Sequence, residues 1–302
     1  MVLLSDPPRN TPGSPNWLTD GRDWPHRDTS AFLQMGRETW HLQRMGSGAK
    51  VLLLHGTGAS THSWAGLLPR LAEQYDTMAI DLPGHGFTQM RPGFVPSVDN
   101  VSIAIRRVLE ALEFQPSLIA GHSAGAAIAL MLARQLPHQP ERIVSLNGAL
   151  KPFAGAMGVI APMMAKLSTI GGFAARSLAK SAEDVGRVER LLLDTGSVPP
   201  RDYISRYATL MRCRGHVQNT LRMMANWNLT AIERICSELK MPVLFVAGQS
   251  DRTVPPDAAM DMARVTPQGS FVCLDGLGHL AHEEAPDTIG EIILGHASET
   301  PV

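Results

Sequence analysis

Short runs of consecutive apolar residues recur along much of the chain. Four of them are separated by segments long enough for helices: KVLLLH (50–55), TMAID (77–81), SLIAG (117–121) and RIVSL (142–146). Two later runs, 242–248 and 270–274, extend the series. Buried parallel strands show this continuous apolar pattern because helices cover both faces of their sheet. The pattern therefore predicts an α/β fold with a mostly parallel central sheet flanked by helices.

The segments around these runs follow other patterns. Residues 1–30 are predicted to form an extended N-terminal arm, because 6–28 are rich in Pro, Asn, Asp and Arg and show no apolar period. Alternation around residues 39–43 predicts antiparallel strands at a sheet edge. Residues 151–236 contain amphipathic stretches, such as 185–193 and 203–211, and are predicted to form an inserted helical lid. The core then consists of residues 31–150 and 237–302.

One motif carries a candidate nucleophile. Gly121-His122-Ser123-Ala124-Gly125 matches G-x-S-x-G, directly follows an apolar run, and opens a series of helix-forming residues. In this strand-turn-helix context a serine occupies a tight turn, where small neighbours are needed and its hydroxyl is exposed above the sheet. Ser123 is therefore the predicted nucleophile.

A serine hydroxyl needs a base to take its proton, and the base needs an acid to orient it. In this architecture both lie downstream, in the order Ser, acid, His. His279 and Asp251 each follow one of the two late strands and are the predicted base and acid. The alternatives are His282 for the base and Asp257 or Asp275 for the acid; we expect Asp257 to begin a helix.

The same edge of the sheet is predicted to hold an oxyanion. The backbone N–H of Ala124 lies at the start of a helix, where the helix dipole favours negative charge. The N–H of Thr57, between Gly56 and Gly58 after the first parallel strand, is the second predicted donor. The predicted substrate pocket consists of Gly56, Gly58, Trp64, His122, Met223 and Met224, with packing the alternative role for Trp64 and hydrogen bonding the alternative for His122.

Composition and charge exclude several other classes. With 27 Lys and Arg against 28 Asp and Glu, the net charge of -1 gives no basic field for nucleic acid. Cys213, Cys236 and Cys273 form no CxxC pair and have no histidine at metal spacing, so neither a metal site nor a disulfide framework is predicted. Thr61 breaks a GxGxxG pattern, and no cofactor is expected. No signal peptide or membrane span is evident, and we expect a cytoplasmic protein.

The predicted lid differs in charge from the rest of the chain. Residues 151–236 hold 12 Lys and Arg against 6 Asp and Glu. The lid also holds several methionines, flexible apolar side chains that suit an adaptable surface: Met157, Met163, Met164, Met211, Met223 and Met224. This combination suits a large apolar ligand with carboxylates, or contact with an acidic partner or a membrane surface; ordinary helix packing is the alternative.

These motifs together resemble those of the α/β-hydrolase superfamily. A closer resemblance, to the magnesium chelatase accessory proteins of bacteriochlorophyll biosynthesis, runs nearly end to end and is carried by residues 23–28, 54–64, 81–88, 121–127, 145–149 and 223–227. The resemblance implies a role at or near magnesium insertion into protoporphyrin in a phototrophic bacterium. It also implies a porphyrin as the ligand and the chelatase subunits as partners.

Three functions are consistent with the sequence. The first is serine hydrolase chemistry on an ester or acyl bond. The second is a non-catalytic accessory protein that binds a tetrapyrrole. The third is lyase or dehydratase chemistry on a porphyrin intermediate, without an acyl-enzyme. The complete set of nucleophile, base, acid and oxyanion donors favours the first, because each occurs at the chain position that the fold requires.

Overall fold

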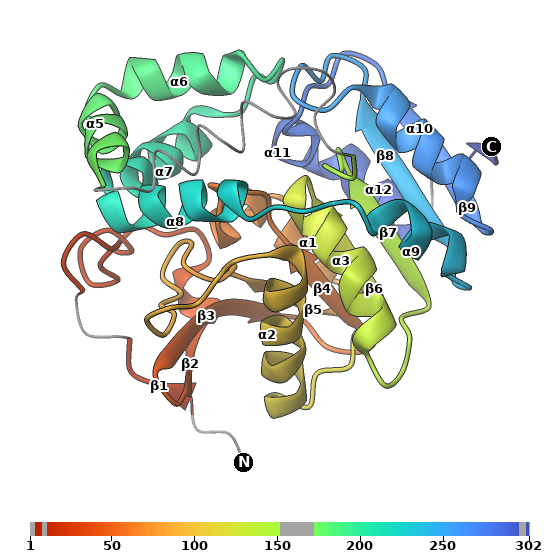
Figure 1. Ribbon diagram of the computed structural model, residues 1–302, viewed down its shortest axis with the longest axis horizontal. Coiled ribbons are helices and arrows are strands. Elements are labelled where there is room, and N and C mark those ends of the chain that lie inside the picture. The colour runs from red at the N-terminus through yellow and green to blue at the C-terminus, as the bar shows by residue number, and fades with distance from the viewer. Residues whose placement is uncertain (1–3, 8–10, 152–171, 296–299, 302) are drawn as a thin grey trace.

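The computed structural model describes residues 4–7, 11–151, 172–295 and 300–301, and a single twisted sheet runs through it (Figure 1). The strand order is β1-β2-β3-β5-β4-β6-β7-β8-β9-β10. The strands are β1 (Leu4–Ser5), β2 (Ser30–Met35), β3 (Glu38–Met45), β4 (Lys50–Leu54), β5 (Asp76–Ile80), β6 (Leu118–His122), β7 (Arg142–Leu146), β8 (Val243–Gly248), β9 (Gly269–Leu274) and β10 (Thr300–Pro301). The six central strands, in the order β5-β4-β6-β7-β8-β9, pair in parallel. The pairs outside them, β1-β2, β2-β3, β3-β5 and β9-β10, are antiparallel.

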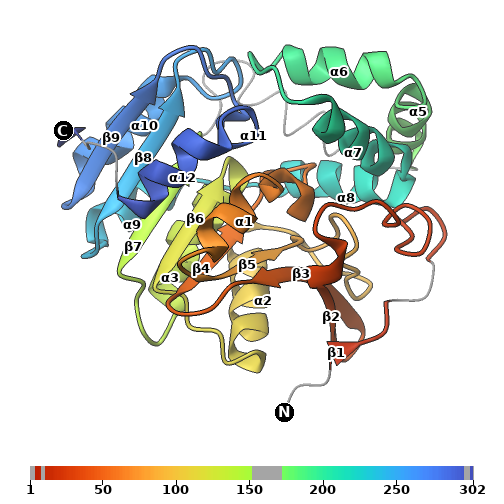
Figure 2. The ribbon, with the colours of Figure 1, turned by 180° about the vertical axis from the view of Figure 1, so that it is seen from behind.

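Helices cover both faces of this sheet, as the continuous apolar strands require. One face packs against α2 (Val98–Ala111), α3 (Ala124–Gln135), α9 (Ile232–Glu238) and α10 (Pro256–Val265). The other packs against η2 (Thr61–Trp64), α1 (Leu67–Ala72) and α12 (Pro286–Leu294), and the short α11 (Ala281–Glu284) lies beside them (Figure 2). The α/β-hydrolase fold predicted from the sequence is confirmed.

The segment between β7 and β8, which we call the helical insertion, contains helices and no strand within its described residues. The helices among its described residues are α5 (Phe173–Ser181), α6 (Val185–Leu193), α7 (Arg201–Arg212), α8 (Arg214–Ala225) and α9. The first four form a layer above the sheet (Figure 1), whereas α9 packs against α3 and α10. Met157, Met163 and Met164 lie outside the described residues. No described helix has the length and apolar character needed to cross a membrane.

The N-terminal residues differ from the extended arm that the composition predicts. Leu4–Ser5 pairs with β2, and residues 12–26 form a succession of turns, followed by the 3-10 helix η1 (Arg27–Thr29). Trp17 and Trp24 are buried in a cluster with Phe32, Phe87 and Leu210. Burial of two tryptophans offsets the cost of ordering a segment that is otherwise polar.

Candidate active site

Ser123 lies in a sharp turn between β6 and α3. Its backbone has φ 51° and ψ −115°, a strained conformation for a residue with a side chain. The turn requires glycine on both sides, since a Cβ at Gly121 would lie 2.3 Å from the Gly125 oxygen and one at Gly125 would lie 2.0 Å from the Leu54 oxygen. The G-x-S-x-G sequence therefore builds a turn that leaves the Ser123 side chain partly exposed.

Ser123, His279 and Asp251 form a hydrogen-bonded relay. His279 Nε2 lies 3.1 Å from Ser123 Oγ, and His279 Nδ1 lies 2.8 Å from Asp251 Oδ2. A carboxylate only accepts hydrogen bonds, so Nδ1 carries the proton and Nε2 is free to accept one from the serine. Each residue follows a parallel strand, β6, β8 or β9, and the carboxyl ends of these strands meet at one edge of the sheet.

Asp251 is buried and accepts four hydrogen bonds. Besides His279, the backbone N–H groups of Thr253 and Val254 donate to its Oδ1 at 2.7 and 2.9 Å, and Asn147 Nδ2 donates to Oδ2 at 2.9 Å. Burial alone raises the pKa of Asp251, but the hydrogen bond from His279 and the other donors outweigh it and lower the pKa. Asp251 is therefore ionised at neutral pH and can orient His279.

Among the described residues, none of the alternative candidates hydrogen-bonds to Ser123 or His279. Asp257 lies in the first turn of α10, as expected, and Asp275 is exposed after β9. His282 lies in α11, where its Nε2 is 2.7 Å from Ser63 Oγ, and burial holds its pKa well below the ordinary value.

Two backbone N–H groups close to the nucleophile in the chain or in space, those of Ala124 and Thr57, have no acceptor among the described residues. Ala124 is the first residue of α3, so its N–H has no partner within the helix. Neither this N–H nor that of Thr57 donates to any described residue. The loop that holds Thr57 passes close to Ser123, because a Cβ at Gly56 would lie 3.1 Å from the serine Cβ.

The other predicted pocket residues take different places. Met223 of α8 is buried over this loop, and its sulfur accepts a hydrogen bond from Thr57 Oγ1 at 3.8 Å, while Met224 is 42% exposed. His122 is buried; its Nε2 donates to the His279 carbonyl at 2.9 Å, and burial lowers its pKa to about 3. Trp64 is fully buried in the core beneath α1 and α12, with its ring 4.6 Å from that of His282.

Two residues that the sequence did not predict as part of the site hold its catalytic groups in place. Asn147, directly after β7, donates to Asp251 and, at 3.2 Å, to the Gly278 carbonyl. Ser197 of the helical insertion accepts a hydrogen bond from the Leu280 N–H at 2.7 Å and thereby holds the loop that carries His279. A polar residue at the carboxyl end of a parallel strand is a signal that points to Asn147; no local pattern distinguishes Ser197.

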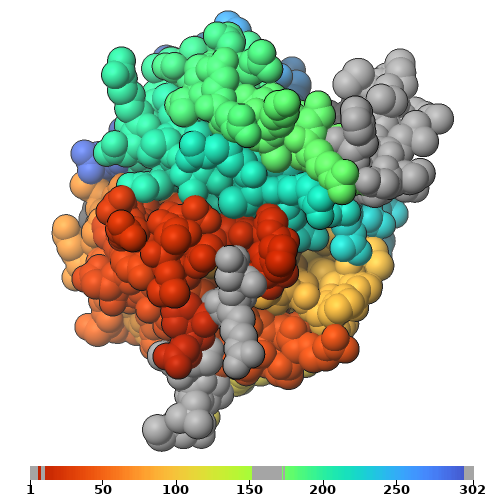
Figure 3. Space-filling model, turned by 90° about the vertical axis from the view of Figure 1, so that its left-hand side faces the viewer, coloured from red at the N-terminus to blue at the C-terminus, as the bar shows by residue number. Residues whose placement is uncertain are grey.

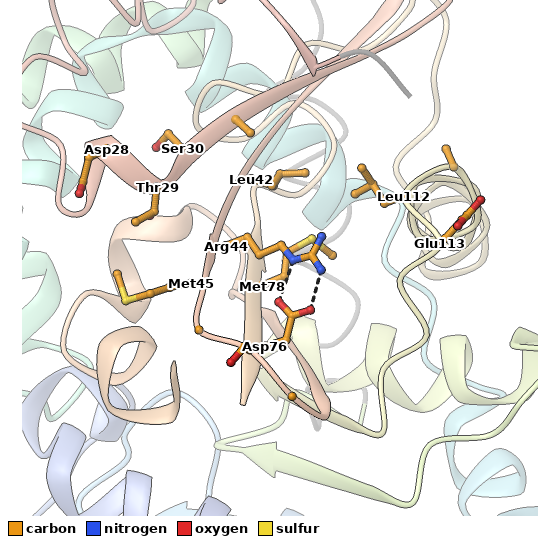
Figure 4. A pocket seen from close by; sticks show the side chains of 15 residues that line it. Asp28, Thr29, Ser30, Leu42, Arg44, Met45, Asp76, Met78, Leu112 and Glu113 are labelled. Carbon is orange, nitrogen blue, oxygen red and sulfur yellow. Dashed lines mark hydrogen bonds and ion pairs between the residues drawn. The ribbon is translucent and has the colours of Figure 1, made fainter. Parts of the chain in front are cut away.

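A separate cavity of about 900 Å³ lies at the opposite edge of the sheet (Figure 4). Arg44 and Asp76 line it and form a two-pronged ion pair, with N–O distances of 2.7 and 2.6 Å. Asp76 is the first residue of β5, whereas Ser123 follows the last residue of β6, so this cavity is remote from the relay. Among the described residues, no group of three or more His, Cys, Asp or Glu side chains could hold a metal ion.

Comparison with known proteins gives the family. The family model for the α/β-hydrolase fold matches residues 50–286. The chain is 36% identical over 278 residues to the magnesium-chelatase 30 kDa subunit of Rhodobacter capsulatus, covering 90% of this chain and 95% of that protein. It is also 27% identical over 270 residues to a pimeloyl-[acyl-carrier protein] methyl ester esterase of Xanthomonas axonopodis pv. citri, covering 86% and 100% of the two chains.

Solved structures show the same architecture. A putative lipase from Acinetobacter baumannii superposes with a TM-score of 0.74 at 23% identity, covering 88% of this chain and 90% of that one. This similarity shows the fold alone, whereas the family model and the relative from Rhodobacter capsulatus match the chain in sequence. The chain belongs to the α/β-hydrolase family, and within it the chain closely resembles the magnesium-chelatase 30 kDa subunit.

Proposed function

We propose that this protein is a serine hydrolase that cleaves an ester or acyl bond at or near the magnesium chelatase step of bacteriochlorophyll biosynthesis. The observation that carries the chemistry is the continuous relay from Ser123 through His279 to the buried carboxylate of Asp251. The observation that favours the pathway is the 36% identity to the chelatase-named relative over nearly its whole length.

The proposed reaction uses the chain's own groups at each step. Ser123 Oγ attacks the carbonyl carbon while His279 Nε2 takes its proton, and the carbonyl oxygen becomes an oxyanion. The N–H groups of Ala124 and Thr57 donate to that oxyanion, which is why we call residues 55–60 the oxyanion loop. His279 returns the proton to the leaving alcohol, and water then cleaves the acyl-enzyme by the same steps.

The proposed substrate is apolar and carries carboxylates, as a porphyrin does. The basic charge of the helical insertion and the position of Met223 over the oxyanion loop support this class. An ester of such a compound is favoured because a methyl ester esterase is among the relatives. Association with chelatase subunits is part of the same proposal.

Labelling with a fluorophosphonate tests the nucleophile without a known substrate. We expect the wild-type protein to be labelled at Ser123, and Ser123→Ala and His279→Ala to remain unlabelled, with ester hydrolysis reduced on the order of 10⁶-fold in Ser123→Ala. Mass spectrometry identifies the labelled residue. A wild-type protein that is not labelled at Ser123 contradicts the proposal.

The assignment of the acid is tested by a matched pair of substitutions. We expect Asp251→Asn to lower kcat for p-nitrophenyl butyrate by about 10⁴-fold, because the orientation of His279 is lost. Asp275→Asn makes the same change of charge after the neighbouring strand and should retain wild-type kcat. Equal effects of the two substitutions would refute the role of Asp251.

Measuring pigment in a complemented host tests whether bacteriochlorophyll synthesis requires the proposed hydrolase reaction. We expect a phototrophic host that carries only the Ser123→Ala protein to lose bacteriochlorophyll, measured by absorbance of extracted pigment, while immunoblotting shows normal protein levels. Full pigment with Ser123→Ala would instead support a tetrapyrrole-binding accessory role.

A further inference from the structure

One face of α8 lies along the oxyanion loop. Three of its residues, His216, Thr220 and Met223, are spaced so that they share that face. His216 Nε2 is 3.0 Å from the Gly58 carbonyl oxygen, and Thr220 Cγ2 would lie 3.5 Å from a Cβ at Gly58. Because Met223 contacts Thr57 and His216 contacts Gly58, the helix touches two successive residues of the loop.

His216 also contacts the loop that follows β5. Its Nδ1 accepts a hydrogen bond from the Gly86 N–H at 3.1 Å. Since an N–H can only donate and a carbonyl can only accept, Nδ1 is unprotonated and Nε2–H donates to Gly58. The imidazole is 2% exposed, and burial lowers its pKa to about 3, so it stays neutral in this one tautomer.

No hydrogen bond from within the oxyanion loop holds the described backbone of Thr57 or Gly58. Within the described residues, two hydrogen bonds are internal to residues 55–60, from the Ala59 N–H at 3.2 Å and from His55 Nδ1 at 2.8 Å, and both end on the Gly56 carbonyl. Gly58, directly after the proposed donor, has φ +82°, and a glycine backbone has more conformational freedom than that of other residues, so this side of Thr57 depends on contacts from outside the loop. A donor placed about 0.5 Å away from its productive position stabilises an oxyanion poorly.

We infer that His216 is a positioning residue that fixes the oxyanion loop, so that the Thr57 N–H is correctly placed only while α8 is seated on the core. This inference rests on the proposed hydrolase function and adds a coupling between the helical insertion and the catalytic step. His216 does not touch the reacting atoms; it acts through the Gly58 carbonyl.

Two amide substitutions separate the two hydrogen bonds of His216. The Gln amide nitrogen takes the place of His Nε2, so His216→Gln can keep the bond to Gly58. The Asn side chain reaches only to the place of His Nδ1, so His216→Asn can keep the bond from Gly86 and loses the bond to Gly58. Val217→Ala, a buried neighbour on α8, is a control for general loosening of the helix.

The measurements are the rate constant for fluorophosphonate labelling of Ser123, kcat and KM for p-nitrophenyl butyrate, and the Tm of each variant. We expect His216→Asn to lower the labelling rate and kcat by about 10- to 100-fold with KM changed less than about threefold, since loss of a whole oxyanion donor costs about 10²–10³. His216→Gln and Val217→Ala should stay within about threefold of wild type at temperatures well below Tm.

The results distinguish this inference from the proposed function. Wild-type labelling at Ser123 together with unchanged labelling of His216→Asn overturns the inference and leaves the hydrolase intact. The inference is also overturned if the labelling rate and kcat of His216→Asn, His216→Gln and Val217→Ala fall only in proportion to the fall in Tm of each variant. Absence of wild-type labelling overturns both.

Discussion

Asn147 supports the site at the scale of a single residue. It joins the carboxylate of Asp251 to the carbonyl of Gly278, and it is itself buried with φ 47°. Asparagine is one of the few residues with a side chain that tolerate this left-handed conformation. One side chain therefore fixes the acid and the loop that carries the base.

Asn147→Gly removes the amide while keeping a backbone that adopts positive φ. A hydrogen bond to a charged group contributes about 1.5–3 kcal/mol, so we expect kcat/KM to fall about 10- to 100-fold. The pKa of Asp251 should rise, because its carboxylate loses one of its hydrogen-bond donors. Asn147→Ala is the control, because it also lacks the amide but tolerates positive φ less well than glycine. If Asn147→Ala is less stable than Asn147→Gly while the two have equal kcat/KM, the difference in stability comes from the backbone conformation. An unchanged kcat/KM in Asn147→Gly would contradict this role.

At the scale of elements, a buried acid joins the helical insertion to the core. Glu283 of α11 is fully buried, and Tyr207 of α7 donates to its Oε1 at 2.7 Å. Ser63 of η2 donates to the same oxygen, while Oε2 has no partner within the described structure. Burial raises the pKa of Glu283 to about 8 despite these donors, with the charge of Glu284 adding to the effect; His282, the neighbouring base, stays neutral.

This buried acid predicts a pH-dependent stability. The unfolded chain releases the proton of Glu283 near the ordinary pKa of 4.5, and the folded protein near 8. Between these values the folded state binds more protons, so rising pH destabilises it, by up to about 1.4 kcal/mol per pH unit. We expect Glu283→Gln to match wild type near pH 4.5 and to exceed its free energy of unfolding increasingly up to pH 8.

Urea denaturation at a series of pH values measures this difference. Glu189→Gln, at an exposed position of α6, should run parallel to wild type across the same range. A constant difference between Glu283→Gln and wild type from pH 5 to pH 8 would show that Glu283 does not titrate in this window.

At the scale of the whole molecule, the N-terminal segment ties the helical insertion to the sheet. Trp17 and Trp24 pack with Phe87 of the loop after β5 and with Leu210 of α7. The Gly215 N–H at the start of α8 donates to the Gly13 carbonyl at 2.6 Å. In Figure 3 the N-terminal residues lie directly against the helices of the insertion.

Trp24→Ala tests this connection. Its indole is 3% exposed and its Nε1 donates to Thr61 Oγ1 at 3.3 Å, so we expect a loss of about 3–5 kcal/mol of stability. Hydrogen exchange of residues 201–212 should accelerate together with that of the N-terminal turns. Leu18→Ala, at a side chain 68% exposed in the same segment, should change stability by less than about 0.5 kcal/mol. Unchanged exchange in α7 would mean that the segment does not restrain the insertion.

The sequence predicts those features whose cause is local. Strands β4 to β9 were predictable within about one residue because buried parallel strands are continuously apolar, and the turn at Ser123 because its glycines have no substitute. The burial of Trp24 depends on Phe87 and Leu210, which are distant in sequence, and that of Glu283 on Ser63 and Tyr207. Such contacts leave no periodic signal, so the sequence pattern could not supply them.

The turn at Ser123 bears on how this chain has evolved. Holding a serine at φ 51° and ψ −115° costs the folded state about 1–3 kcal/mol, out of the 5–15 kcal/mol that a domain typically has. Glycine would adopt the same backbone conformation with less strain. A protein that did not need the serine hydroxyl could carry glycine at this position and gain stability. The proposed hydrolase function would account for a serine, and not a glycine, at this strained position.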